Sequence, residues 1–401
     1  MIPRNSYLDK LDNVRNKQII KVLTGVRRSG KSTILQLYQN RLKDEGVVNE
    51  QIQNLNFEDL GISNLLDYHK LYDYLQSHLL PDKMNYVFLD EIQNVPHFEK
   101  VLDSLFIKSN VDLYVTGSNA FMLSGELATL LSGRYIEIHV FPLSFKEFYP
   151  TTDQDKDLAF GSYLDYGGFP FAISLDDNET YHEYVDGIIN TVLIKDVLTR
   201  KKLANATLVR ELAQFLTDTT GNLVTPQKIA NVLTSHGIKT SAATVSSYLA
   251  GFIDAYLFYR CDRYDISGKK YLTVNSKYYP VDPALRQALI GTKRPNFGSR
   301  LEAVVYMELK RRGNEIYVGS LGNREIDFIA VKNGVKTYYQ VSLSVKNEKT
   351  YQREVRGLRE IKDNFRKVLL TEDQGNYNDN GIEQKNVVDW LLEEWKGVRQ
   401  N

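Results

Sequence analysis

Hydrophobic and polar positions along the first third of the chain predict strands that alternate with helices. Short continuous apolar runs are typical of parallel strands buried on both faces, and stretches with helical spacing separate them. The expected strands are residues 19–23, 53–59, 86–91, 112–119 and 135–140. The expected helices are residues 7–14, 32–38, 65–80, 97–108 and 120–131. This alternation indicates an α/β protein built on a parallel sheet.

A different arrangement follows from about residue 145. Helices are expected at residues 144–148, 162–166 and 181–200, interrupted by the Gly-Gly-Phe-Pro break at 167–170. Further helices are expected at residues 208–218, 225–233 and 241–249, with strands at 257–264 and 277–282. The last part predicts a helix, three strands, a helix and a strand, at residues 298–311, 315–318, 325–330, 337–342, 349–361 and 366–371.

A glycine-rich turn joins the first expected strand to the helix after it. Gly25, Gly30, Lys31 and Ser32 fit the pattern G-x-x-x-x-G-K-[ST]. Glycines let successive backbone N–H groups face one phosphate group, and the helix adds the positive end of its dipole. Lys31 would reach the β- and γ-phosphates of ATP, and Ser32 would ligate Mg²⁺. The residues expected to bind the nucleotide are Gly25, Arg27, Arg28, Ser29, Gly30, Lys31, Ser32 and Thr33, the alternative being an ordinary Gly/Lys-rich turn.

Two acidic residues, Asp90 and Glu91, end the apolar strand expected at residues 86–91. Ligands of parallel sheets bind at the carboxyl ends of the strands. Asp90 would therefore hold Mg²⁺ through water, and Glu91 would orient and polarise the attacking water. The alternative is a strand that ends in a solvated acidic turn.

Small polar residues, Ser118 and Asn119, end the next expected strand. If this strand lies between the two nucleotide-binding strands, its end approaches the γ-phosphate. Ser118, or Asn119 as second choice, would then sense that group. Both residues are equally suited to cap the following helix, and the two roles are compatible.

Arg134 precedes the fifth expected strand. An arginine at the end of that helix is placed to meet the nucleotide of a neighbouring subunit and to neutralise transition-state charge there. The alternative is a surface arginine with no catalytic role.

Overall composition limits the partner classes. The 401 residues include 50 basic and 50 acidic side chains, so that any nucleic-acid site must be local. Cys261 is the sole cysteine, which excludes a disulfide framework and predicts a thiol in the core. The sequence shows neither a signal peptide nor an apolar run of membrane-spanning length, and we expect a cytoplasmic protein without a membrane partner.

The phosphate loop, the Leu-Asp-Glu strand, the Ser-Asn strand end and the Gly-Arg before strand five resemble an AAA+ ATPase. This resemblance implies the strand order 5-1-4-3-2. Residues 141–148 further resemble a bacterial and archaeal group that joins this ATPase to a winged helix and a nuclease-like domain. The implied domains are an ATPase core at 1–145, a helical lid at 146–205, a winged helix at 206–292 and a restriction-endonuclease-like domain at 293–401.

In the expected winged-helix domain, one helix has Thr225 as its N-cap and Pro226 as its first residue. A helix, a short turn with glycine and a second helix form the helix-turn-helix pattern. The residues expected to contact DNA are Lys228, Lys239, Ser241, Thr244, Lys269 and Lys270. Because the second helix has no Arg or Asn suited to base readout, we expect salt-sensitive and weakly sequence-specific binding. The alternative is a winged helix that packs within an assembly.

The last domain resembles the PD-(D/E)xK fold, with Glu302 and Asp327 at its acidic positions. Gln340 stands where the second acid belongs, and Ser342 stands where the lysine belongs. A neutral Gln loses a charged metal ligand and Ser cannot replace an ammonium group, so we expect a degenerate nuclease. Lys346 and Lys349 are the residues that would take over the role of the lysine if cleavage persisted.

We therefore expect a Mg²⁺-dependent ATPase that binds, remodels or translocates on DNA. The trans role of Arg134 requires a homo-oligomer, with a hexameric ring as one form. Two other functions compete: a nucleotide-switched signalling or defence module with a protein partner, and an ATP-gated nuclease.

Overall fold

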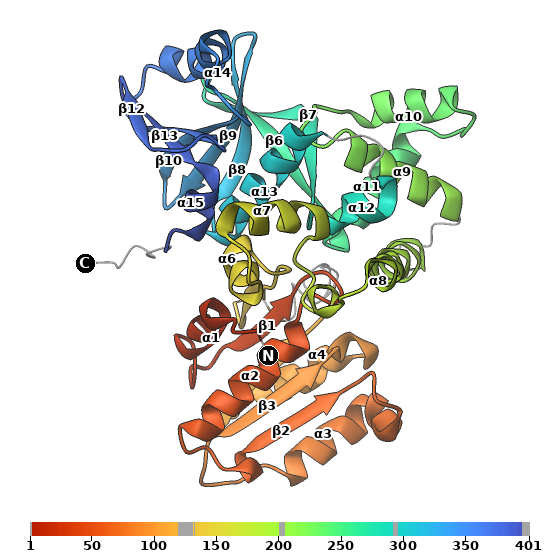
Figure 1. The fold of residues 1–401 in the computed structure, drawn as a ribbon. Coiled ribbons are helices and arrows are strands. Elements are labelled where there is room, and N and C mark those ends of the chain that lie inside the picture. The colour runs from red at the N-terminus through yellow and green to blue at the C-terminus, as the bar shows by residue number, and fades with distance from the viewer. Residues whose placement is uncertain (1, 119–130, 132, 200–204, 292–295, 395–401) are drawn as a thin grey trace. The chain divides into compact units, whose positions relative to one another are not determined.

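The computed structural model describes residues 2–118, 131, 133–199, 205–291 and 296–394 (Figure 1). The chain divides into two compact units. The first comprises Met1–Pro142 with Asp254–Tyr256, and the second comprises Leu143–Ile253 with Leu257–Asn401. No helix in the described ranges is long and apolar enough to span a membrane.

A five-stranded parallel sheet forms the centre of the first unit, in the order β2-β3-β4-β1-β5. Its strands are β1 (Ile20–Thr24), β2 (Ile52–Asn56), β3 (Asn85–Asp90), β4 (Val111–Thr116) and β5 (Tyr135–His139). Every residue of β1, β3 and β4 is buried, as the continuous apolar runs require. The predicted α/β class and the order 5-1-4-3-2 are confirmed.

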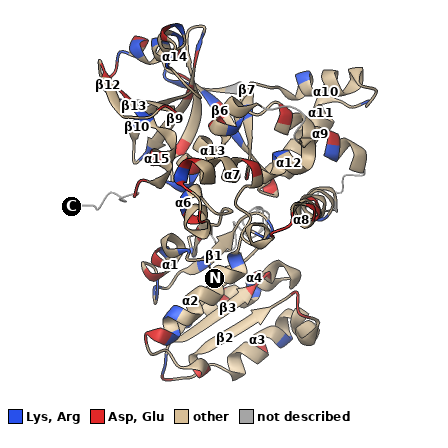
Figure 2. Cartoon of the chain, in the orientation of Figure 1, with Lys and Arg blue, Asp and Glu red and all other residues tan. Residues whose placement is uncertain are grey.

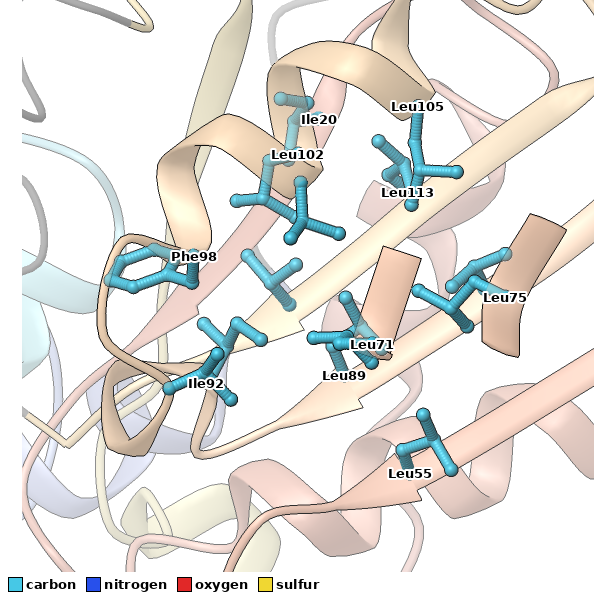
Figure 3. Packing of buried hydrophobic residues seen from close by; sticks show 14 of the residues in the cluster. Ile20, Leu55, Leu71, Leu75, Leu89, Ile92, Phe98, Leu102, Leu105 and Leu113 are labelled. Carbon is cyan, nitrogen blue, oxygen red and sulfur yellow. The ribbon is translucent and has the colours of Figure 1, made fainter. Parts of the chain in front are cut away.

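Helices cover both faces of this sheet because alternate strand residues point to opposite sides. The helices are α1 (Asn5–Asp12), α2 (Lys31–Asp44), α3 (Tyr68–Ser77) and α4 (Phe98–Phe106). On one face the strand residues Ile20, Leu89 and Leu113 pack with Leu71 and Leu75 of α3 and Leu102 and Leu105 of α4 (Figure 3). On the other face Leu23, Phe88 and Tyr114 pack with Leu11 of α1 and Ile34 and Tyr38 of α2. Each such burial contributes about 1.5–3 kcal/mol, so the sheet is the rigid middle layer of this unit.

The single helix expected over residues 65–80 is wrong. A 3-10 helix occupies Leu60–Leu66, and α3 starts after Asp67. The carboxylate of Asp67 accepts hydrogen bonds from the backbone N–H groups of His69 and Lys70, both at 3.0 Å. This N-cap overrides the apolar spacing that continues through the junction. The helix expected at 120–131 lies outside the described residues except for Leu131.

Short helices make up the first part of the second unit. The helices between residues 143 and 291 are α6 (Phe145–Phe148), α7 (Lys156–Tyr166), α8 (Asn178–Thr191), α9 (Ala206–Asp218), α10 (Pro226–Ser235), α11 (Ala242–Asp254) and α12 (Ala284–Ile290). The π-helix Val192–Thr199 continues α8. Helix α7 starts earlier than residue 162 because the Asp155 carboxylate caps the backbone N–H groups of Asp157 and Leu158.

Helices α10 and α11 begin where the sequence places their caps. The hydroxyl of Thr225 accepts a 3.0 Å hydrogen bond from the backbone N–H of Lys228, with Pro226 in the first position of α10. The Ser241 hydroxyl accepts a 3.1 Å bond from the Thr244 N–H. Two antiparallel strands follow, β6 (Phe258–Asp265) and β7 (Lys270–Pro280), so the second begins before the expected residue 277. Cys261 on β6 is buried, which raises the pKa of its thiol and confirms the predicted core position.

An eight-stranded mixed sheet includes these two strands, in the order β12-β13-β11-β10-β9-β8-β6-β7. The remaining strands are β8 (Glu315–Leu321), β9 (Arg324–Lys332), β10 (Val335–Val341), β11 (Arg366–Thr371), β12 (Tyr377–Asp379) and β13 (Ile382–Asn386), and the helices are α13 (Phe297–Arg311), α14 (Glu348–Glu360) and α15 (Val387–Leu392). Strand β6 pairs in parallel with β8, Arg263 opposite Val318. The hairpin of β6 and β7, which carries the expected DNA contacts Lys269 and Lys270 around its turn, thus extends the sheet of the C-terminal segment.

Strand β9 contains an irregularity at Asp327. Ile326 pairs with Gly319 and Ile329 with Tyr317, so that three steps along β9 face two along β8. Such a bulge re-aims the side chains at the extra position. It allows Ile326 and Ile329 to share one apolar cluster, while Asp327 is buried elsewhere.

Candidate nucleotide-binding site

The phosphate loop leaves β1 and enters α2 through two glycines in conformations unsuited to other residues. Gly25 has φ +140°, and a Cβ atom there would lie 2.1 Å from the carbonyl oxygen of Val140. Gly30 has φ +96° and precedes the first residue of α2, so the first N–H groups of the helix open toward the loop. The loop therefore has the curled backbone that a phosphate cradle needs, with a helix of 14 residues behind it.

Lys31 lies inside this cradle. Its side-chain Nζ donates hydrogen bonds to the carbonyl oxygens of Gly25 at 3.0 Å and Val26 at 3.2 Å, and the residue is buried. The hydroxyls of Ser29 and Ser118 are buried and hydrogen-bonded to no described residue. Because a buried hydroxyl without a partner is costly, these two groups fit a site that receives a polar ligand.

The other expected loop residues surround the start of α2. Ser32 and Thr33 are exposed on its first turn. Arg27 forms an ion pair with Glu58 at 3.5 Å, and Arg28 adopts φ +66°. These positions leave the Ser32 hydroxyl accessible to a cation.

Arg4, which the sequence analysis did not select, supports the loop from behind. Its guanidinium group donates to the backbone carbonyls of Ser29 at 3.2 Å and Phe141 at 2.9 Å. The guanidinium also lies over the Tyr7 ring, 4.7 Å from its centroid, and the Tyr7 hydroxyl accepts a bond from the Phe141 N–H. A buried arginine with these partners ties the N-terminal helix to the loop and to the chain after β5. No sequence pattern signals it, because its partners are 25 and 137 residues away.

Asp90 ends β3 and Glu91 follows it, at the same edge of the sheet as the loop, because β1 and β3 are parallel to the strand between them. The Asp90 carboxylate accepts hydrogen bonds from the Thr116 hydroxyl and, at 3.2 Å, from the Asn56 amide. Burial raises the pKa of Asp90, and hydrogen bonds from Thr116 and Ser32 act in the opposite direction. A carboxylate that is buried beside Ser32 fits a divalent cation, which would favour its charged form.

Glu91 adopts a left-handed backbone conformation, with φ +52° and ψ +44°. For a residue other than glycine this costs about 1–3 kcal/mol and is concentrated at functional sites. The Glu91 N–H donates a 2.9 Å hydrogen bond to the Thr116 hydroxyl, and the Gln93 amide bonds the Glu91 carboxylate. Thr116 therefore fixes both acidic residues, a role that the sequence analysis missed because Thr116 is 25 residues from Glu91.

Ser118 lies just beyond β4, which runs between β1 and β3 as expected. It is buried, and its hydroxyl belongs to the unpartnered pair described above. The other candidate for this role, Asn119, lies outside the described residues.

Arg134 lies at the amino ends of the parallel strands, because it precedes β5. The loop follows β1 and lies at their carboxyl ends. A strand of five residues separates the two ends by about 16 Å. Its guanidinium group pairs with Asp103 of α4 and lies 5.5 Å from the centroid of the Phe106 ring. This placement keeps Arg134 away from the Lys31 loop of its own chain.

The four candidate lysines for DNA, Lys228, Lys239, Lys269 and Lys270, are exposed, and none forms an ion pair with a residue that the structure describes. Ser241 and Thr244 are bonded to each other, hydroxyl to hydroxyl at 2.9 Å. Their hydroxyls therefore serve the start of α11, which leaves the lysines as the charged groups of this surface.

A buried lysine pairs with acidic residues of the C-terminal segment, which the sequence analysis did not predict. Lys277 of β7 is buried, and its Nζ lies 2.9 Å from Glu302 and 2.7 Å from Glu325. The Asp327 carboxylate accepts a 2.8 Å bond from the Val341 N–H, and the Gln340 amide donates to Glu354 at 3.0 Å. Ser342 is bonded weakly to the Ser344 carbonyl, at 3.4 Å. Over the residues described, no group of three or more acidic, His or Cys side chains is arranged to hold a metal ion.

Comparisons with known proteins place the site in a family context. Residues 17–149 match the model of an AAA domain, and residues 158–296 match a domain of unknown function. An uncharacterized protein of Haemophilus influenzae is 41% identical over 98% of this chain and 99% of its own length. An uncharacterized protein of Methanocaldococcus jannaschii is 32% identical over 92% and 85%, respectively.

Two solved structures show weaker likeness. The Walker-type ATPase of Pyrococcus abyssi has 16% identity and a TM-score of 0.49, over 72% of this chain and 96% of that one. The ORC1 protein of Aeropyrum pernix, solved in complex with DNA, has 13% identity and a TM-score of 0.34, over 72% and 92%. Because the match to the Haemophilus influenzae protein extends along nearly the whole of both chains, this chain belongs to the same family of AAA-domain proteins.

Proposed function

We propose that the protein is a Mg²⁺-dependent ATPase of the AAA+ type, which hydrolyses ATP to ADP and phosphate and acts on DNA as an oligomer. The observation that carries this proposal is the convergence of Lys31, Asp90 and Glu91 at one edge of the parallel sheet, with Thr116 bonded to both acidic residues. A charged cradle and a fixed carboxylate at one edge are what phosphoryl transfer to water requires.

Each group has a separate role. The backbone N–H groups at the start of α2 and the Lys31 ammonium would bind the phosphates. Ser32 and Asp90 would hold Mg²⁺, which supplies charge neutralisation when bound. The Glu91 carboxylate would orient the attacking water and accept its proton. The buried hydroxyl of Ser118 would sense the γ-phosphate.

The support for an oligomer is the position of Arg134. Since it lies at the sheet edge away from its own loop, it would neutralise transition-state charge only in a neighbouring subunit. Its pairing with Asp103 is partly exposed, with the arginine side chain 42% exposed, and such pairs stabilise a protein little. The arginine can therefore exchange this partner for a phosphate at low cost.

The support for DNA is the set of exposed lysines at 228, 239, 269 and 270, which have no ion-pair partner among the described residues. They offer charge to phosphates, and the hydroxyls of Ser241 and Thr244 are engaged in capping α11. Binding would be dominated by the DNA backbone and would weaken with salt.

ATP turnover with and without DNA tests this function. Single-stranded, duplex and four-way branched DNA would be compared at two salt concentrations, with Glu91→Gln as the blank. Stimulation that fades as salt rises is expected. If none of the DNA forms changes the rate of ATP turnover at either salt concentration, the DNA part of the proposal is contradicted and a protein partner is favoured.

A further inference from the structure

A cleft of about 570 Å³ opens between β9, β10 and helix α14 in the second unit. Four of its nine lining residues are basic, and Figure 2 colours Lys and Arg positions of α14 blue. The charged lining residues are Arg324, Glu325, Lys349, Arg353, Glu354 and Arg356. Four cations thus face two carboxylates, which gives the cleft a surplus of positive charge.

Three of the cations form a row on α14. Lys349, Arg353 and Arg356 are spaced four and three residues apart, so they share one helix face. Seven residues of helix span about 10 Å, a length suited to a linear polyanion rather than to a single phosphate. Gly357 brings this helix close to the sheet, since a Cβ atom there would lie 2.7 Å from the Ile326 side chain.

These cations are available for a ligand. Lys349 has no ion pair within the part of the chain that the structure describes. Arg353, with 73% of its side chain exposed, pairs with the adjacent Glu354, and Arg356, with 68% exposed, lies 3.8 Å from Glu360. Exposed pairs of this kind contribute about 0–1 kcal/mol, so a phosphate can replace them.

A buried cation pairs with one of the lining carboxylates. Glu325 lines the cleft and pairs at 2.7 Å with Lys277, which also pairs with Glu302. The Lys277 ammonium group therefore pairs with two carboxylates, which would need another cation to balance them if the lysine were absent.

We propose that this cleft binds the phosphate backbone of nucleic acid without a divalent cation and without cleaving it, with Lys277 as the buried cation that pairs with Glu325 of its lining. The inference rests on the proposed action on DNA and adds a second contact surface to the exposed lysines of α10 and the β6–β7 hairpin. Gln340, bonded to Glu354, supplies no charge that a metal would need.

The first test measures binding of a fluorescent DNA duplex to the full chain in EDTA, without nucleotide, over a range of salt. A cleft variant combines Lys349→Ala, Arg353→Ala and Arg356→Ala. A matched control combines Arg359→Ala, Lys362→Ala and Arg366→Ala, three cations of the same region that do not line the cleft. In the cleft variant, the slope of log affinity against log salt should become less steep by about 3. The control should keep the slope of the unaltered chain.

A third variant, with Ala at Lys228, Lys239, Lys269 and Lys270, separates this inference from the proposed function. Loss of binding in that variant, with an unchanged slope in the cleft variant, overturns the cleft and leaves the DNA function standing. If the unaltered chain does not bind duplex at all, the cleft proposal fails, while ATP turnover with the three forms of DNA still decides the proposed function.

The second test addresses Lys277. Lys277→Met should bind duplex at least tenfold more weakly in EDTA, because the carboxylates of Glu302 and Glu325 lose their cation, and Mn²⁺ should restore part of the loss. Lys277→Arg should bind normally. If the Met variant does not fold, Glu325→Gln serves instead and should tighten binding. Binding by the unaltered chain that requires Mg²⁺ or Mn²⁺, or nicking of plasmid DNA by it, would overturn the inference.

Discussion

The backbone N–H of Glu91 donates a 2.9 Å hydrogen bond to the hydroxyl of Thr116, the same hydroxyl that donates to the carboxylate of Asp90. One side chain on β4 thus holds both Asp90, the last residue of β3, and Glu91, which follows it. The strained backbone of Glu91 has a fixed partner, which gives its carboxylate a defined direction at the nucleotide edge.

Replacing Thr116 by Val should therefore impair hydrolysis more than binding. The change keeps the shape of the side chain but leaves the N–H of Glu91 without a partner, at a cost of about 1–3 kcal/mol. We expect kcat to fall about tenfold to hundredfold with little change in nucleotide affinity, since small misplacements of a catalytic group have effects of this size. Thr116→Ser keeps the hydroxyl and should recover most of the rate. Equal rates for Thr116→Val and the unaltered chain would show that Thr116 does not position Glu91 for hydrolysis.

Gly25→Ala should abolish nucleotide binding. The new Cβ would lie 2.1 Å from the Val140 carbonyl, and φ +140° is itself unfavourable for alanine. Gly46→Ala is the matched control, because Gly46 has φ +94° but nothing within 4 Å of its added Cβ. The control should lose about 1 kcal/mol of stability and bind ATP normally by calorimetry. Normal affinity in the Gly25 variant would show that the loop tolerates displacement and does not act as the cradle.

Asp282 should make the stability of the second unit depend on pH. Burial raises the pKa of Asp282 to about 6, although the N–H groups of Ala284 and Gly168 oppose the rise. The folded state therefore holds the proton more tightly than the unfolded state, whose group has the ordinary value of 3.8. The resulting stabilisation is present below about pH 4 and is lost as pH rises to about 6, by about 2–3 kcal/mol.

Urea unfolding of the unaltered chain and of Asp282→Asn checks this sign. The unfolding free energy of the unaltered chain should fall relative to that of Asp282→Asn as pH rises from 4 to 6, because only the unaltered chain loses the protonated carboxyl. If the unaltered chain instead gained stability relative to Asp282→Asn over this range, the folded state would favour the charged form of Asp282.

Arg134 should act on the nucleotide of a neighbouring subunit. Mixing inactive Arg134→Ala with inactive Glu91→Gln should restore a fraction of the turnover, because some interfaces then combine an intact Arg134 with an intact Glu91. Asp103→Ala, which frees Arg134 from its partner within the chain, should leave turnover intact. An inactive mixture together with an inactive Asp103 variant would indicate that the Arg134–Asp103 pair serves the fold of each chain.

The elements around the candidate nucleotide site were predictable where their pattern is local in sequence. Gly25, Lys31 and Ser32 lie within eight positions, and Asp90 with Glu91 ends an apolar run, so strand, loop and helix could be placed together. The supporting residues were not predictable. Thr116 and Arg4 act through contacts with residues 25 to 137 positions away, and their types are common in strands and at chain ends.

The second unit shows the same limit. Its helices and strands follow from caps and apolar spacing, as at Thr225, but the pairing of β6 with β8 depends on strand edges that no local pattern specifies. Lys277 occurs in a Lys-Tyr-Tyr segment that resembles a partly exposed strand, yet it is buried beside Glu302. A buried ammonium is revealed only once its carboxylate partners are placed.

The central claim, that Lys31 binds and Glu91 hydrolyses ATP at one site, is tested most directly by the nucleotide that each variant retains. The unaltered chain, Glu91→Gln and Lys31→Ala would be incubated with Mg²⁺ and labelled ATP, separated from free nucleotide, and their bound label identified. Glu91→Gln should retain uncleaved ATP, the unaltered chain should yield ADP, and Lys31→Ala should retain neither. ADP formed by Glu91→Gln at the normal rate, or ATP held tightly by Lys31→Ala, would contradict the account.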